Sequence, residues 1–216
     1  MDTWIKDCEP LDFLNIDVCF CIFEDFYYGP SDAISIAEHK QTTALPSVTN
    51  KSATTFNFRT LKAEENTEKL LAYYREILRL AKNYGKKDLE ISQYFWVKLS
   101  FWRGELNISM DFPWYDTLDE IAPLLEKIDS TEDGVLLHDE DMGWEAEIVA
   151  KDGFIYAREG DPETGDINIL HKIPRGPMAK DCREALERAR ALIGWLSDNI
   201  GDLYWTKTRY PADLVA

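Results

Sequence analysis

The strongest constraint on the fold is a pair of strand-like segments joined by a tight turn. In "WEAEIVAKDGFIYAREG", residues 144–160, Glu145 and Glu147 alternate with Ala146 and Ile148 before the sequence Lys-Asp-Gly. Alternation with a period of two is typical of a strand with one solvated face, and Asp-Gly is a preferred connection between antiparallel strands. The segment therefore predicts a β-hairpin and an antiparallel sheet.

Other segments share this β-pattern. Residues 13–24 alternate cleanly and predict a half-buried strand, and residues 91–112 predict a second hairpin around "WRGEL". Residues 52–61 and 167–173 predict single strands. No βαβ alternation or glycine-rich phosphate loop interrupts this series.

Three segments carry apolar residues at helical spacing. They are residues 64–84, 117–128 and about 178–199. Gly85 should end the first helix, and Pro123 should weaken or kink the second. The order of elements predicts a single α+β domain over residues 1–216, an antiparallel sheet of β-hairpins with about three amphipathic helices packed on it.

The two predicted hairpins resemble each other. Each begins with Trp, turns at a Gly and is followed by an amphipathic helix, over about 91–128 and 144–199. Two interpretations stay open, a duplicated hairpin–helix unit and coincidence between common motifs.

Composition favours a cytoplasmic protein. No apolar run approaches the roughly 20 residues that span a bilayer, and the acidic N-terminal segment lacks the basic and apolar regions of a signal peptide. The four cysteines are therefore expected to be reduced and to lie in or beside the core. They are Cys8, Cys19, Cys21 and Cys182.

The negative charge is confined to one part of the chain. Residues 105–170 contain nineteen Asp and Glu against three basic residues, and this segment carries the whole formal net charge of −16. Contacts to phosphates and to anionic lipids require Lys and Arg, so nucleic-acid and membrane-surface binding are disfavoured. A concentrated negative field instead attracts cationic partners.

The acidic segment matches no catalytic or metal-binding motif. EF-hand spacing fails from Asp139 and from Asp161, and the chain has no GxSxG motif or His–Cys constellation. We expect no cofactor and no metal, and His138 is interpreted as a partly exposed strand residue. A loose Mg²⁺ or Ca²⁺ site at Asp139 and Asp141 is the alternative. Glycosidase-like carboxylate pairs are too numerous here to indicate a site.

Two interpretations of the acidity remain. One is solubility alone. The other is protein binding, because the segment also contains large aromatic residues, which anchor many interfaces. These residues are Trp102, Trp114, Tyr115 and Trp144.

The stretch "HDEDMGWEAEIVAKDGFIYAREGDP", residues 138–162, resembles the immunity proteins of bacterial contact-dependent and polymorphic toxin systems. The resemblance lies in composition and architecture and covers the second half of the chain. It implies a cytoplasmic, non-enzymatic inhibitor that binds a cognate toxin domain, often a basic nuclease, and blocks its active site. It carries no residue-level roles.

We therefore expect an acidic face that binds a basic protein. The candidate contact residues are Asp139, Glu140, Asp141, Trp144, Glu145, Glu147, Glu159, Asp161 and Glu163. The alternatives are an enzyme with a divalent-cation site in the acidic segment, and a homo-oligomer built through residues 96–102.

Overall fold

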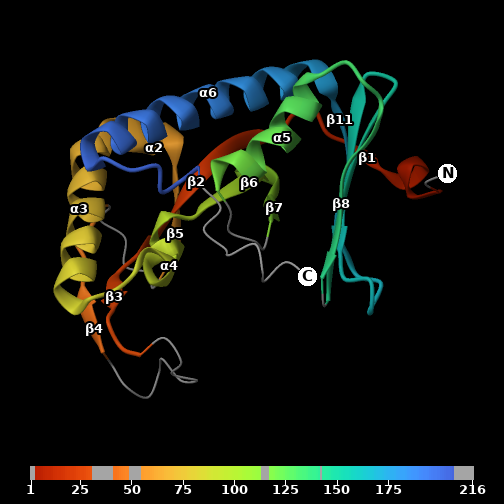
Figure 1. Cartoon of the computed structure of the whole chain (residues 1–216). Helices are drawn as coiled ribbons and strands as arrows, with labels where there is room; N and C mark the ends of the chain where they lie inside the picture. The colour runs from red at the N-terminus through yellow and green to blue at the C-terminus, as the bar shows by residue number, and fades with distance from the viewer. Residues whose placement is uncertain (1–2, 31–40, 49–54, 113–116, 142, 207–216) are drawn as a thin grey trace. The chain divides into compact units, whose positions relative to one another are not determined.

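The structure is a computed structural model that describes residues 3–30, 41–48, 55–112, 117–141 and 143–206. Its helices and mainly antiparallel strands form an α+β fold, as the sequence predicts (Figure 1). The chain divides into two units. Unit 1 contains Met1–Val18, Leu99–Pro113 and Glu120–Glu187, and unit 2 contains Cys19–Lys98, Trp114–Asp119 and Arg188–Ala216.

Unit 1 contains a five-stranded sheet, counted over the described residues, in the order β1-β11-β10-β9-β8. The strands are β1 (Glu9–Pro10), β8 (Gly134–Asp141), β9 (Trp144–Lys151), β10 (Phe154–Gly160) and β11 (Ile167–Pro174). β1 pairs parallel with β11, and the other pairs are antiparallel. The hairpin predicted over residues 144–160 and the strand predicted over 167–173 are thus confirmed.

The turn between β9 and β10 explains why this hairpin can be predicted from the sequence. Asp152 and Gly153 have φ angles of 51° and 79°. A two-residue turn with both φ angles positive matches the twist of the strands that it joins. It sets Phe154 opposite Lys151, and the ladder continues from there to Gly160 opposite Glu145.

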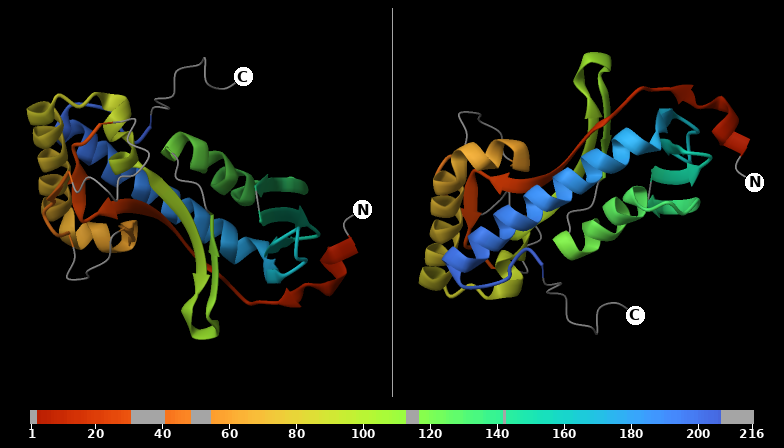
Figure 2. Two further views of the ribbon diagram at one scale, coloured as in Figure 1. Left: turned by 90° about the horizontal axis from the view of Figure 1, so that it is seen from below. Right: turned by 90° about the horizontal axis from the view of Figure 1, so that it is seen from above.

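Two helices lie against one face of this sheet in unit 1. They are most of α5 (Leu118–Asp129) and the first half of α6 (Arg175–Ile200), on the same side of the strands (Figures 1 and 2). The middle of that face is formed by small or aliphatic residues that are buried. They include Ala146, Ile148, Ala150, Ile155 and Ala157. Pro123 lies inside α5.

Arg175, at the start of α6, satisfies the end of α5. Its guanidinium is buried and donates to the carbonyl oxygens of Lys127, Ile128 and Glu132 at 2.9–3.1 Å. The last carbonyls of a helix have no partner within the helix, so an external donor stabilises them. The planar guanidinium reaches several acceptors at once, which an ammonium group does not.

We predict that Arg175→Ala lowers the free energy of unfolding by about 2–4 kcal/mol, because it leaves buried carbonyls without donors. Urea denaturation measures the change. Arg183→Ala on the same helix is the control, since the ion pair of Arg183 with Asp129 is exposed and should matter much less. Equal losses from the two variants would contradict the role of Arg175.

The second predicted hairpin, over residues 91–112, starts later than expected. It consists of β6 (Val97–Arg103) and β7 (Ile108–Asp111) around η4 (Gly104–Leu106). The preceding residues form the short helices α4 (Asp88–Ile91) and η3 (Ser92–Phe95), so Phe95 is not in a strand.

Unit 2 is built around an aromatic core. Trp205 lies edge-on to Phe20, Tyr74 and Phe95, with ring centroids 4.8–6.4 Å apart. Besides α4 and η3, its elements include β3 (Asp25–Tyr27), β4 (Thr42–Ala44), β5 (Thr55–Arg59), α2 (Thr60–Ala63), η2 (Glu64–Asn66) and α3 (Thr67–Tyr84). Gly85, with φ 67°, ends α3 as expected.

Strand β2 (Asn15–Phe23) corrects one expectation. The alternation predicts a half-buried strand, but β2 is buried on both faces apart from its end residues. Cys19 and Cys21, on the face opposite Phe20, are fully buried. The alternation distinguished large side chains from small ones rather than buried ones from exposed ones.

β2, β6 and α6 each begin in one unit and end in the other. The single domain and the duplicated hairpin–helix unit stay predictions. No helix in the described part of the chain has the length and apolar character that crossing a membrane requires.

Candidate functional site

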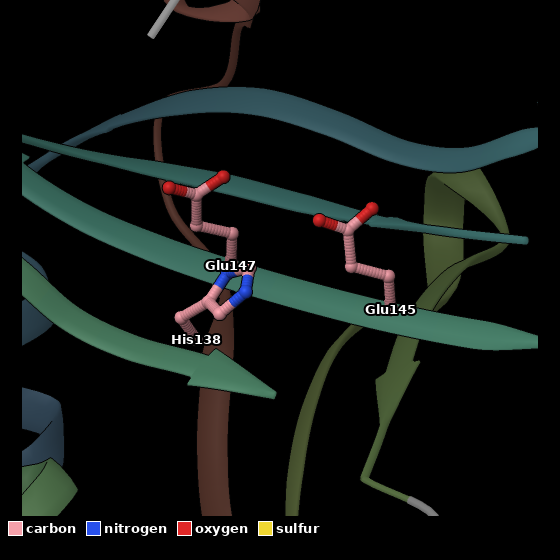
Figure 3. Close-up of side chains that lie close together, drawn as sticks. All are labelled: His138, Glu145 and Glu147. Carbon is pink, nitrogen blue, oxygen red and sulfur yellow. The ribbon is translucent and has the colours of Figure 1, made fainter. Parts of the chain in front are cut away.

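The face of the five-stranded sheet that points away from α5 carries a cluster of ionisable side chains. His138 of β8, Glu145 and Glu147 of β9, and Arg158 of β10 lie on adjacent strands, with His138 and Arg158 both opposite Glu147. Figure 3 shows His138, Glu145 and Glu147 on neighbouring strands. We call this side of the sheet the outer face.

Arg158 binds both glutamates of the cluster. Its Nη2 donates to Glu145 Oε1 and lies 3.4 Å from Glu147 Oε2. The Trp4 ring of η1 (Thr3–Asp7) lies over the guanidinium, 5.5 Å from centroid to Cζ. The sequence predicts a solvated face here, but Glu147 is only 7% exposed. A buried carboxylate requires such a partner, because its charge loses solvation.

The same cluster contains the donor atoms of a metal site. Ligand atoms of His138, Glu145 and Glu147 lie within 4.8 Å of one another, and imidazole with carboxylates is a donor set that Zn²⁺ uses. The Arg158 guanidinium already supplies positive charge to both carboxylates. We therefore interpret the cluster as an ion-pair network that joins β9 to β10.

We predict that Arg158→Ala lowers the free energy of unfolding by about 1–3 kcal/mol, because Glu147 loses its buried counter-charge. The double variant Arg158→Ala, Glu147→Gln should recover part of the loss, since no buried charge is then left unpaired. Chemical denaturation of both proteins tests the pair. If the double variant is no more stable than the single one, the network does not hold Glu147.

The second feature of unit 1 is a concentration of acids at one end of this sheet. The β8–β9 and β10–β11 turns lie at the same end, because Gly160 is opposite Glu145 and Asp141 is opposite Trp144. We call their acidic residues the acidic tip. They are Glu140, Asp141, Asp161, Glu163 and Asp166.

Asp161 organises the longer of these two turns. Its Oδ1 accepts the N–H groups of Glu163 and Thr164 at 2.8 and 3.2 Å, and its own N–H donates to Asp166 O. Gly160 lets the chain close, because a Cβ there would lie 2.3 Å from Asp166 O. Beside this turn a hollow of about 320 Å³ is lined by residues that include Glu145, Arg158 and Asp161.

The nine sequence candidates occupy three different places in unit 1. Glu140, Asp141, Asp161 and Glu163 belong to the acidic tip, and Glu145 and Glu147 belong to the outer face. Asp139, Trp144 and Glu159 lie on the helix-covered face, since Asp139 and Glu159 are opposite Ala146 and Trp144 alternates with it. Glu159 is buried, and the other two are half-buried.

Three residues of the site are absent from the candidates that the sequence supplies. They are His138 and Arg158 on the outer face and Asp166 at the tip. The turn at Asp152 and Gly153 contains the signal for Arg158, since counting outward from it places Arg158 opposite Glu147. Of the aromatic candidates, Trp114 and Tyr115 lie outside the described residues.

None of the free cysteines Cys8, Cys21 and Cys182 has an environment that favours a reactive thiolate. Burial, with a smaller contribution from Asp7, raises the pKa of Cys8 to about 11. Burial raises the pKa of Cys21 to about 12 and raises that of Cys182 as well. Nucleophilic cysteines have lowered pKa values, so these thiols do not suggest covalent catalysis.

We predict that iodoacetamide modifies native Cys8 slowly at neutral pH and about tenfold faster per pH unit up to about pH 11, because only the thiolate reacts. The buried Cys19, Cys21 and Cys182 should react only after unfolding. Mass spectrometry of timed samples measures the rates, with Cys8→Ser as the control. Rapid modification at neutral pH would contradict the raised pKa.

Comparison with protein-family models, curated proteins and solved structures gives no match for this chain.

Proposed function

We propose that this protein is a binding protein of the immunity type, which neutralises a basic toxin domain by covering it with the acidic tip. The observation that carries the proposal is the meeting of two acidic turns at one end of the sheet. Neither turn, residues 140–145 or 160–167, contains Lys or Arg. Arg158, the nearest cation of the ladder, is bound to Glu145 and Glu147.

A surface of this kind suits the capture of a cationic protein. Like charges held close together repel one another, which costs stability, and they also create a field that attracts opposite charge. Such a field raises association rates and rejects acidic competitors. A nuclease groove must be cationic to hold phosphates, so an acidic tip that occupies it would also block its substrate.

One property of the outer face favours binding over catalysis. Glu145 and Glu147 are both bonded to Arg158, so their carboxylates already have a counter-charge. In this proposal the acids of the tip act through their shared field.

The test is capture of a basic protein by the immobilised chain from a lysate of its native cells, followed by purification and rebinding. We predict that Glu140→Lys, Asp141→Lys, Glu163→Lys lowers the association rate of that protein at low salt by about 10–1000-fold. Asp161 is left in place because its carboxylate holds the turn. Stopped-flow fluorescence or surface plasmon resonance measures the rate.

The matched control reverses three exposed acids elsewhere, Asp12, Glu65 and Glu187. Each reversal adds two charges, so both variants change the formal net charge from −16 to −10. The control should associate nearly as fast as the wild type. Failure to capture any basic protein, or equal effects of the two variants, would overturn the proposal.

A further inference from the structure

Strand β8 is a long edge strand, and most of its residues are exposed or half-buried. It is the last strand in the order of the five-stranded sheet, and the strand at the opposite edge, β1, has only two residues. Of the eight residues of β8, only Leu136 is buried. Edge strands present unpaired backbone groups that can accept another strand.

The register shows which backbone groups of β8 point outward. Asp141 is opposite Trp144, with only two residues between them. If this were an open pair, one of its ladder hydrogen bonds would have to join those two residues, which is impossible because they are consecutive. The pair Asp141–Trp144 must therefore be a hydrogen-bonded one, and hydrogen-bonded and open pairs alternate along an antiparallel ladder. Glu140 and His138 belong to the open pairs, so their N–H and C=O groups point away from β9.

The side chains of β8 change in character along the strand. Its first half is apolar, with Val135 57% exposed and Leu137 half-buried. Its second half is acidic on both faces, since Glu140 is on the outer face and Asp139 and Asp141 are on the other. An added strand would therefore meet apolar groups at one end and carboxylates at the other.

We infer that β8 accepts an extended segment of the partner as an additional strand of the sheet. The chemistry of β8 specifies that segment. It carries consecutive Lys or Arg residues beside residues 139–141 and β-branched residues beside residues 135–137. Main-chain hydrogen bonds to His138 and Glu140 supply affinity, and the side chains supply selectivity. This inference rests on the proposed function and gives the acidic tip a defined mode of binding.

A second copy of the chain fits this edge less well than a basic segment does. In a parallel arrangement of two β8 strands, the acids at 139–141 would face the same acids and repel them. In an antiparallel arrangement, those acids would lie beside Gly134, Val135 and Leu136, which offer no positive charge. Charge complementarity therefore selects a cationic partner.

The probe is the peptide Lys-Arg-Lys-Thr-Val-Thr-Val, which matches β8 in the antiparallel direction, added to the full chain. We expect it to bind with a Kd on the order of 100 µM and to slow hydrogen exchange at the amides of His138 and Glu140. The peptide Glu-Asp-Glu-Thr-Val-Thr-Val is the control and should not bind. Absence of binding by the basic peptide, binding without protection of these two amides, or a dimeric chain in solution would overturn the inference.

Substitution of the edge provides a second test. His138→Pro removes one outward N–H without removing a bond to β9, and proline is tolerated at such edge positions. It should weaken peptide binding about tenfold, whereas His138→Val should not. Equal affinities of the two variants for the peptide would contradict strand addition. If His138→Pro does not fold, the exchange measurement on the wild type decides alone.

The two proposals can fail separately. If the captured basic protein is lost on reversal of Glu140, Asp141 and Glu163 but binds His138→Pro as well as it binds His138→Val, the proposed function stands and strand addition fails. If the peptide protects the edge but the acid reversal leaves the captured protein bound, the proposed function fails.

Discussion

The arrangement of the candidate site depends on one turn. Asp152 and Gly153 adopt positive φ angles, and this conformation fixes which residue of β10 lies opposite each residue of β9. A shift by one residue would move every side chain to the other face of the sheet. Arg158 would then enter the helix-covered side with a buried charge, and Glu147 would lose its counter-ion. The turn therefore sets the distribution of charge as well as the backbone geometry.

The acidic residues of the sheet in unit 1 have two roles, which depend on how far each residue lies from that turn. Glu147 is well inside the sheet, is buried, and is matched by Arg158. Glu140, Asp141 and Glu163 are at the far ends of the strands, where solvent screens them and no base lies in the adjoining sequence. Buried charge must be paired locally, whereas exposed charge can remain in excess and act at a distance. Part of the excess is therefore carried by the turns of the sheet.

The sequence predicts those parts of the fold in which local pattern and tertiary surroundings agree. The β9–β10 hairpin is correct because its turn residues and its alternation indicate the same register. β8 shows no clear alternation in the sequence, because three apolar residues follow one another at Val135, Leu136 and Leu137. The register of β8 shifts at these residues. A bulge of this kind breaks the period of two. The short helices before β6 escape detection because one helical turn is too short to show a period.

For a similar reason, only part of the candidate site could be predicted from the sequence. The excess of acids could be counted, but the position of the two acidic turns at one end of the sheet requires that two hairpins lie side by side. Glu159 illustrates the opposite error. It belongs to the acidic segment by sequence, yet its position opposite Ala146 directs it to the buried face. Composition identifies a charged segment, and only the register sorts its residues between surface and core.

The acids of β8 are also explained by a need that every open sheet has. Charged residues on an edge strand prevent sheets of identical molecules from joining, and Asp139, Glu140 and Asp141 would serve that purpose. This protection is selective, because it repels edges of the same charge and attracts a basic strand. Protection from self-association and recognition of a cationic segment are therefore two consequences of the same side chains. The two functions make different demands at Val135, since protection alone gains nothing from an exposed aliphatic residue on the same strand as the acids. That residue favours recognition as the reason for the composition of β8.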